Sequence, residues 1–340
     1  MNHKINLVAQ SFGRKNEYLR TIFSIWSFYV HVSAEFKKSK TLLFTDNPDF
    51  FRAYLSELPV TYELLTPERM TEMRGENDFL HRIKIAVIAE AFKRSEGNLL
   101  YMDGDAFFTE DPSPLILRLT KEVSFMHTNE YPFHVLREIP LPSGAPFHAV
   151  LNYFEENVFT MANGNKRKFS PTLFSWNAGV VMLHRQHEYL LTDVFAITDQ
   201  LYASTRNHAS EQYAFSIVLQ TQTELKACEK VSYHYWHKVK KQIGDHFLNH
   251  NISFPWLNLP VEQKKDLVSK WTRKLPGYFD RHLLTVRDNA IQAFNRNDFR
   301  QGYFWAFNAL IRNPFNIKFI RDFAYHTRRF LFKRRFFGRL

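Results

Sequence analysis

Residues 99–108, Leu-Leu-Tyr-Met-Asp-Gly-Asp-Ala-Phe-Phe, take an apolar run into two acidic residues, Asp103 and Asp105. The apolar part, Leu99–Met102, predicts a buried strand. Open α/β sheets bind their ligands beyond the carboxyl ends of their strands, which is where these two carboxylates stand. The segment therefore predicts an α/β fold with a functional site directly after this strand.

The residues before this segment alternate between strand and helix patterns. Short apolar runs predict strands at Ile5–Ala9, Thr41–Thr45 and Thr61–Leu65. Apolar residues at helical spacing predict helices from Lys15 to about Val32 and from Phe79 to Phe92. Strands separated by helices at this spacing are typical of a mainly parallel, Rossmann-like sheet with helices on both faces.

The rest of the chain continues this alternation and then becomes helical. The expected elements are a helix at Phe147–Phe159, a strand at Phe174–Leu183 that Asn177-Ala178-Gly179 interrupts, and helices at Glu188–Tyr202 and Ser210–Leu219. Beyond Gln263 the pattern predicts helix only, with Asp288–Asn313 resembling one tetratricopeptide-type hairpin. We therefore predict an α/β domain over residues 1–262 and a helical extension over residues 263–340.

Composition excludes several classes of protein. The chain has 340 residues, of which 45% are hydrophobic and 23% charged, so it is long enough and apolar enough for a real core. A single cysteine, Cys228, excludes an internal disulfide framework and favours a reducing compartment. No apolar run reaches the roughly 18 residues of a membrane span, and Met1–Gln10 does not have the pattern of a signal peptide. The expected location is cytoplasmic.

The positive charge is concentrated at the C-terminus. Residues 312–340 contain nine Lys or Arg and one acidic residue, so they carry +8 of the net charge of +11. The near-neutral remainder argues against a nucleic-acid-binding domain and favours a local anionic partner. Residues 315–340 are also rich in Phe, which predicts contact with an anionic membrane surface; the alternative is a docking helix with a solvated basic face.

The pair Asp103 and Asp105 suggests a metal site. Carboxylate oxygens suit Mg²⁺ or Mn²⁺, which usually complete their shell with water and substrate phosphates. The alternative is a surface turn, since Asp-Gly-Asp is common in turns. An EF-hand is excluded, because its loop positions 5 and 12 would be Phe107 and Pro114.

In its wider context the segment resembles the nucleotide-sugar glycosyltransferases of the GT-A fold, in particular the retaining, glycogenin-type members. Three further segments match that family in order over about residues 5–240: Ser175–Val180 with its Asn-Ala-Gly, the pair Glu211-Gln212 at a helix start, and Tyr233–Lys238. The resemblance implies a GT-A fold, a nucleotide-sugar donor such as a UDP-sugar, and Mn²⁺ or Mg²⁺.

The resemblance also implies metal ligands. Asp103 would face the donor sugar or ribose and the metal, while Asp105 would hold the metal on the donor diphosphate. A histidine completes the set, and His234 is preferred to His237 because its setting is typical of a strand end. The Gly and Lys-Pro-Trp that follow this histidine in the family are absent, and Lys238 is the substitute candidate for the phosphate contacts.

Further donor-site residues follow from the same resemblance. Asn177, Ala178 and Gly179 would let backbone approach the donor sugar. Lys84, with Arg82 as its rival, would neutralise charge on the departing diphosphate, unless either belongs to a solvated helix face. Asp46 would read the nucleobase or ribose, or only cap the following helix.

Glu211 and Gln212 would lie beside the anomeric carbon. Glu211 replaces the Asp of the family and would stabilise oxocarbenium character or act as a base; alternatively it is only a helix N-terminal charge. The sequence thus predicts a metal-dependent glycosyltransferase acting on a glycan or lipid-linked acceptor. Its rivals are a non-catalytic GT-A-like binding module acting through the helical tail and an Asp-x-Asp phosphohydrolase.

Overall fold

The structure is a computed structural model that describes residues 4–139 and 144–337, with side chains up to residue 332. The chain divides into two compact units. The first comprises the residues up to Tyr235 together with Asn251–Thr272, and the second comprises Trp236–His250 and the residues from Arg273 onward. The domain boundary predicted between residues 262 and 263 stays a prediction.

The first unit contains a seven-stranded mixed sheet in the order β12-β6-β11-β4-β1-β2-β3. All of its strands run parallel except β11, which is antiparallel to both β4 and β6. The strands are β1 Ile5–Ser11, β2 Thr41–Thr45, β3 Val60–Leu64, β4 Asn98–Met102, β6 Val123–Met126, β11 Val180–Leu183 and β12 Glu224–Ala227.

Three short antiparallel ladders supplement this sheet. They pair β5 Ala106–Phe108 with β13 Ser232–His234, β7 Asn129–Pro132 with β10 Phe174–Trp176, and β8 Phe159–Thr160 with β9 Lys166–Arg167. The helices of the first unit are α1 Lys15–His31, α2 Pro48–Leu55, α3 Pro67–Arg74, α4 Arg82–Arg94, α5 Ser113–Ile116, α6 Ala145–Glu156, α7 Leu190–Thr205, α8 Ser210–Gln222 and α10 Phe254–Leu257.

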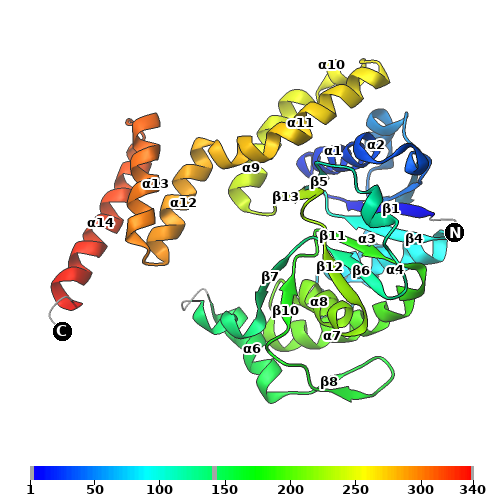
Figure 1. Ribbon diagram of the computed structural model, residues 1–340, viewed down its shortest axis with the longest axis horizontal. Coiled ribbons are helices and arrows are strands. Elements are labelled where there is room, and N and C mark those ends of the chain that lie inside the picture. The colour runs from blue at the N-terminus through cyan, green and yellow to red at the C-terminus, as the bar shows by residue number, and fades with distance from the viewer. Residues whose placement is uncertain (1–3, 140–143, 338–340) are drawn as a thin grey trace. The chain divides into compact units, whose positions relative to one another are not determined.

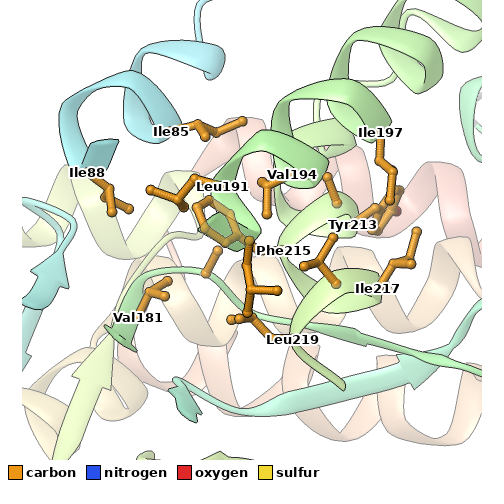
Figure 2. Close-up of a cluster of buried hydrophobic side chains, with 14 of the residues drawn as sticks. Ile85, Ile88, Val181, Leu191, Val194, Ile197, Tyr213, Phe215, Ile217 and Leu219 are labelled. Carbon is orange, nitrogen blue, oxygen red and sulfur yellow. The ribbon is translucent and has the colours of Figure 1, made fainter. Parts of the chain in front are cut away.

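Helices cover the sheet through its alternating side chains. Val8, Tyr101 and Val181 of the strands pack into one buried apolar cluster with α4, α7 and α8. Figure 2 shows part of this cluster, in which Ile85 and Ile88 of α4 are drawn with residues of α7 and α8. The α1 helix, which is almost wholly buried along its length, packs on β1 and β5. The sheet thus packs against α4, α7 and α8 through one set of side chains, while α1 packs on β1.

The predicted fold class is confirmed. The mixed, mainly parallel sheet with flanking helices is the arrangement expected of a GT-A-like domain, and a helical C-terminal region follows it (Figure 1). The predicted helix at Phe147–Phe159 is wrong at its end, because α6 stops at Glu156 and Phe159 belongs to β8. Asn157 adopts an extended backbone there, and Phe159 packs edge-on against the ring of Phe154.

The second unit is built on α-helices. They are α9 Lys238–Asn251, α11 Val261–Arg281, which the two units share, α12 Leu283–Asn295, α13 Phe299–Arg312 and α14 Ile317–Phe337. The hairpin of α12 and α13 turns at Asn297, which has a φ of 63°, and Asp298 then caps α13 by accepting a hydrogen bond from Gln301 N. The core of this unit centres on Phe294.

The inner face of α14 closes that core. Phe319 is 4% exposed, Phe323 lies against Phe294, and the ring of Phe330 lies 4.5 Å from that of Phe299. The composition of residues 315–340 suggested a membrane-facing surface rich in Phe. Phe319, Phe323 and Phe330 do not belong to such a surface, because they pack into this core. The side chains of residues 333–340 lie outside the described residues. No helix within residues 4–139 and 144–337 is both long and apolar enough to span a bilayer.

Candidate metal centre

The two carboxylates stand directly after the buried strand β4. Asp103 N donates to Gly179 O at 2.8 Å and Ala106 N donates to Asp103 O at 3.0 Å, so the segment from Asp103 to Asp105 is a tight turn between β4 and β5. A Cβ on Gly104 would lie 2.5 Å from Thr21 Oγ1 of α1, which explains the glycine. The segment is therefore a turn, and the same turn carries the two carboxylates.

Asp103 faces a buried cation. Its Oδ2 accepts from Lys84 Nζ at 3.1 Å and its Oδ1 accepts from the Tyr101 hydroxyl at 2.7 Å. Lys84 Nζ also donates to Ala178 O at 3.1 Å and lies 2.9 Å from Glu211 Oε1. Burial opposes the charge on the Lys84 ammonium, but the Asp103 and Glu211 carboxylates outweigh it and raise the pKa of Lys84.

Tyr101 shares this buried environment. Burial and then the neighbouring Asp103 carboxylate raise the pKa of the Tyr101 phenol well above its ordinary value, so it remains a hydrogen-bond donor to Asp103. Tyr101 was not among the site residues predicted from the sequence. The signal was present, because residues two apart on a strand lie on the same side, and Tyr101 precedes Asp103 by two.

His234 reaches the carboxylates from a different part of the chain. Its strand, β13, pairs with β5 so that His234 stands opposite Ala106. His234 Nε2 lies 3.2 Å from Asp105 Oδ1, and its Nδ1 lies 2.7 Å from Asn177 Oδ1. Asp103, Asp105 and His234 each offer a ligand atom, and these atoms lie within 4.8 Å of one another.

Gly179 makes this arrangement possible. A Cβ at position 179 would lie 2.2 Å from His234 Nδ1, so a larger residue would displace the ring. Gly179 N also donates to Asn177 Oδ1 at 3.0 Å. The small residues before β11 therefore give room to a side chain of the cluster.

The chemistry of this group fits a divalent cation. Asn177 Oδ1 can only accept, so the hydrogen between it and His234 sits on Nδ1. In a neutral ring Nε2 then carries an unshared electron pair and faces the carboxylate of Asp105. In that neutral form the two acceptors repel one another, and a cation bound between them removes the repulsion; a protonated ring would instead donate to Asp105. Imidazole nitrogen and carboxylate oxygen are ordinary ligands of divalent metals.

Other predicted residues lie around the cluster. Gln212 Nε2, on α8, donates to Glu130 Oε2 at 2.8 Å and to Ser175 Oγ at 3.1 Å. Its Oε1 lies 3.5 Å from Ala178 N. Glu211, the preceding residue, is 3% exposed and pairs with Lys84. Hydrogen bonds and one ion pair thus connect these predicted residues to the cluster. Asn177 contacts His234 directly, Ala178 and Glu211 contact Lys84, and Gln212 shares the Glu130 carboxylate with Asn177.

Arg82, Asp46 and His237 have partners outside the cluster, and Lys238 lies in the second unit. The Arg82 guanidinium pairs with Asp199, at 2.8 Å from Nε to Oδ1. Asp46 accepts from Gly13 N at 2.9 Å and from the Tyr18 hydroxyl at 2.7 Å. The helix cap suggested for Asp46 is provided by its neighbour Asn47, whose side chain accepts from Phe50 N. In the second unit, Lys238 begins α9 and His237 Nε2 lies 3.7 Å from Asp288 Oδ2.

Two solved glycosyltransferase structures are similar to the chain, whereas no protein-family model and no curated protein matches it. One is mouse xyloside xylosyltransferase 1 in its apo form, with 12% identity and a TM-score of 0.44 over 66% of this chain and 84% of that one. The other is the apo bifunctional glycosyltransferase WbbM, with 12% identity and a TM-score of 0.41 over 80% of this chain and 44% of that one.

Proposed function

We propose that the chain is a metal-dependent glycosyltransferase that moves a sugar from a nucleotide-diphosphate sugar, UDP-linked, to a glycan or lipid-linked acceptor. One observation carries the proposal: Asp103, Asp105 and His234 converge at the carboxyl end of β4, with ligand atoms within 4.8 Å of one another and His234 Nε2 lying 3.2 Å from Asp105 Oδ1. The carboxyl edge of an open α/β sheet is where substrates bind. The order of the motifs along the chain supports the substrate class.

Asp105 and His234 would hold Mn²⁺ or Mg²⁺, with Asp103 beside them. When bound, such an ion supplies a Lewis acid and a template for the donor diphosphate. The protein contributes positioning. Lys84 would hold Asp103 and Glu211 in place, because its Nζ donates to Asp103 Oδ2 and to Ala178 O at 3.1 Å and lies 2.9 Å from Glu211 Oε1. Its predicted contact with the departing diphosphate stays a prediction.

Glu211 and Gln212 are proposed as the residues beside the reacting sugar. The amide nitrogen of Gln212 is held by Glu130 and Ser175. A held amide costs little reorganisation when charge develops on the sugar, which is the advantage of a preorganised polar group. The Glu211 carboxylate, which Lys84 holds at 2.9 Å, would stabilise positive character at the anomeric carbon or act as a base.

The function is tested by incubating the protein with a panel of nucleotide sugars and Mn²⁺ and following donor hydrolysis. We expect one donor to be consumed by the wild type and by Asp49→Asn, a control whose side chain is 89% exposed. Asp105→Asn should abolish consumption. Release of phosphate from an aryl phosphate with no donor consumed would point to a phosphohydrolase instead. Donor binding without turnover would identify a binding module.

We also propose that the outer face of α14 contacts an anionic membrane surface. This face is exposed and carries basic and aromatic residues at helical spacing: Lys318, Arg321, Tyr325, Arg328 and Phe332. Basic residues contribute about 1 kcal/mol each near anionic lipid.

The membrane proposal is tested by sedimentation with phosphatidylglycerol vesicles. The wild type should co-sediment with them and not with phosphatidylcholine vesicles. A variant with Lys318, Arg321 and Arg328 changed to Glu should stay in the supernatant, because its charge on this face is reversed. It should still fold, because those side chains are exposed and are not part of the core. Equal sedimentation of the two proteins would show that this face binds no membrane.

A further inference from the structure

Glu130 is a carboxylate of β7 that was not among the residues predicted from the sequence. It accepts three hydrogen bonds: from Asn177 Nδ2 to Oε1 at 3.0 Å, and from Gln212 Nε2 and Ser175 Oγ to Oε2 at 2.8 and 3.1 Å. Amide nitrogens can only donate, so both oxygens of Glu130 act as acceptors. A single carboxylate therefore binds two amide side chains that belong to different parts of the chain.

The amide of Asn177 has one orientation in this network. Its Nδ2 faces Glu130, and its Oδ1 accepts from Gly179 N at 3.0 Å. Turning the amide over would set its NH₂ group against the N–H of Gly179 and its oxygen against a carboxylate. Glu130 on one side and Gly179 on the other thus fix which atom of Asn177 faces His234.

The fixed amide determines the state of the imidazole. Because Asn177 Oδ1 faces His234 Nδ1 at 2.7 Å, the ring carries a hydrogen on Nδ1 and leaves Nε2 directed at Asp105. Histidine ligands of metals usually donate their second N–H to a fixed acceptor, which sets the tautomer and orientation of the ring. Here the acceptor is an amide oxygen whose own orientation a carboxylate maintains.

We propose that Glu130 and Asn177 are a positioning pair that holds His234 with its hydrogen on Nδ1, ready to bind a divalent cation through Nε2. The proposal rests on the proposed function in taking His234 as a metal ligand. It gives Asn177 a role beyond approach to the donor sugar, and it links the metal side of the site to Gln212, which the same carboxylate holds.

The test uses the direction of the hydrogen bond that Asn177 Nδ2 donates to Glu130 Oε1. In Glu130→Gln, the single oxygen of the introduced side chain stays with Gln212 and Ser175, and its NH₂ group then meets that of Asn177. In Asn177→Asp, two carboxylates face one another. In the double variant, the carboxylate introduced at position 177 keeps an acceptor for His234 and Gly179 and receives a hydrogen bond from the amide introduced at position 130. Every group again has a partner, and the net charge equals that of the wild type.

The first measurement is Mn²⁺ affinity by calorimetry, with thermal denaturation to verify that each variant is folded. Glu130→Gln should weaken binding by about 10- to 100-fold. The double variant should recover to within roughly threefold of the wild type. Wild-type affinity in Glu130→Gln, or a double variant as weak as the weaker single one, would overturn the proposal. If Asn177→Asp does not fold, the comparison of Glu130→Gln with the double variant decides.

The second measurement needs no metal and so is independent of the proposed function. Nitrogen NMR of ¹⁵N-histidine-labelled protein identifies which ring nitrogen of His234 carries hydrogen, with His234→Gln to assign the signal. We expect hydrogen on Nδ1 in the wild type and in the double variant, and a mixture of both tautomers in Asn177→Ala. A bare Nδ1 in the wild type, or an unchanged single tautomer in Asn177→Ala, would refute the positioning role even if the protein transfers sugar.

Discussion

At the scale of single residues, the carboxylates of Asp103 and Glu211 depend on Lys84 as their shared cation. Its side chain is 7% exposed and lies between Asp103 and Glu211, and the side chain of Glu211 is only 4% exposed. Removing one partner from a buried group of charges is far more costly than replacing the whole group, because the remaining charges lose their compensation. Lys84 therefore stabilises the fold as well as the site.

Lys84→Met should lower the free energy of unfolding by about 3–5 kcal/mol at neutral pH, measured by urea denaturation. Asp103 and Glu211 would then face one another without a cation. Lys93→Met, on the exposed side of the same helix, is the control and should change stability by less than about 0.5 kcal/mol. A loss below about 1 kcal/mol for Lys84→Met would contradict the arrangement of charges.

Cys228 offers a second test at this scale. The thiol is fully buried, and burial raises its pKa to about 12, so almost no thiolate is present at pH 8. The folded protein should not react with a disulfide reagent at pH 8, and should react fully in guanidinium chloride. Rapid reaction of the native protein would show that the segment between β12 and β13 is not packed as described.

Some of these residues were predictable from the sequence and others were not, for a physical reason. Asp103 and Asp105 are signalled locally, because they follow an apolar strand. Glu130 is held through partners 45 to 82 positions away, so only the folded chain shows its role. Gly179 was expected to let backbone approach a ligand, and the structure shows in addition that it leaves room for the His234 ring.

At the scale of elements, periodicity predicted the strands of the main sheet that precede Asp103 and most helices. It failed where tertiary packing ended a pattern, as at Phe159. Periodicity also left undecided what the aromatic side of α14 contacts, because a helix with Phe on one side and Arg or Lys on the other can pack against either a membrane or a protein core. His326 of α14 stacks on the ring of Phe294 of α12, so the inner aromatic side of α14 packs against α12.

The hairpin of α12 and α13 relies on close approach at Gly302. A Cβ there would lie 2.4 Å from the ring of Phe294, which is 1% exposed. Gly302→Ala should therefore destabilise the second unit by about 1–3 kcal/mol through overpacking, although alanine favours a helix. Asn308→Ala, at a half-buried position of the same helix, is the control, because it also raises helix propensity.

Thermal denaturation followed by circular dichroism would measure the effect of Gly302→Ala. The expected result is a lower transition temperature for Gly302→Ala than for both the wild type and Asn308→Ala. Increased stability would mean that α12 and α13 are farther apart than the ring of Phe294 requires.

At the scale of the whole molecule, charge and chemistry are separated along the sequence. Residues 312–340 carry +8 of the net +11, while the carboxylates, His234 and the buried Lys84 lie in the first unit. A basic region outside the first unit concentrates electrostatic attraction in one segment and leaves the body near neutral. This division supports the proposal of an enzyme whose C-terminal region brings it to an anionic surface.

The central claim is that Asp103, Asp105 and His234 together bind a divalent cation, and isothermal calorimetry with Mn²⁺ tests it most directly. We predict saturable binding by the wild type and by Asp49→Asn, whose substituted side chain is exposed, and no detectable binding by Asp105→Asn. Absence of binding by the wild type, or equal binding by Asp105→Asn, would contradict the claim.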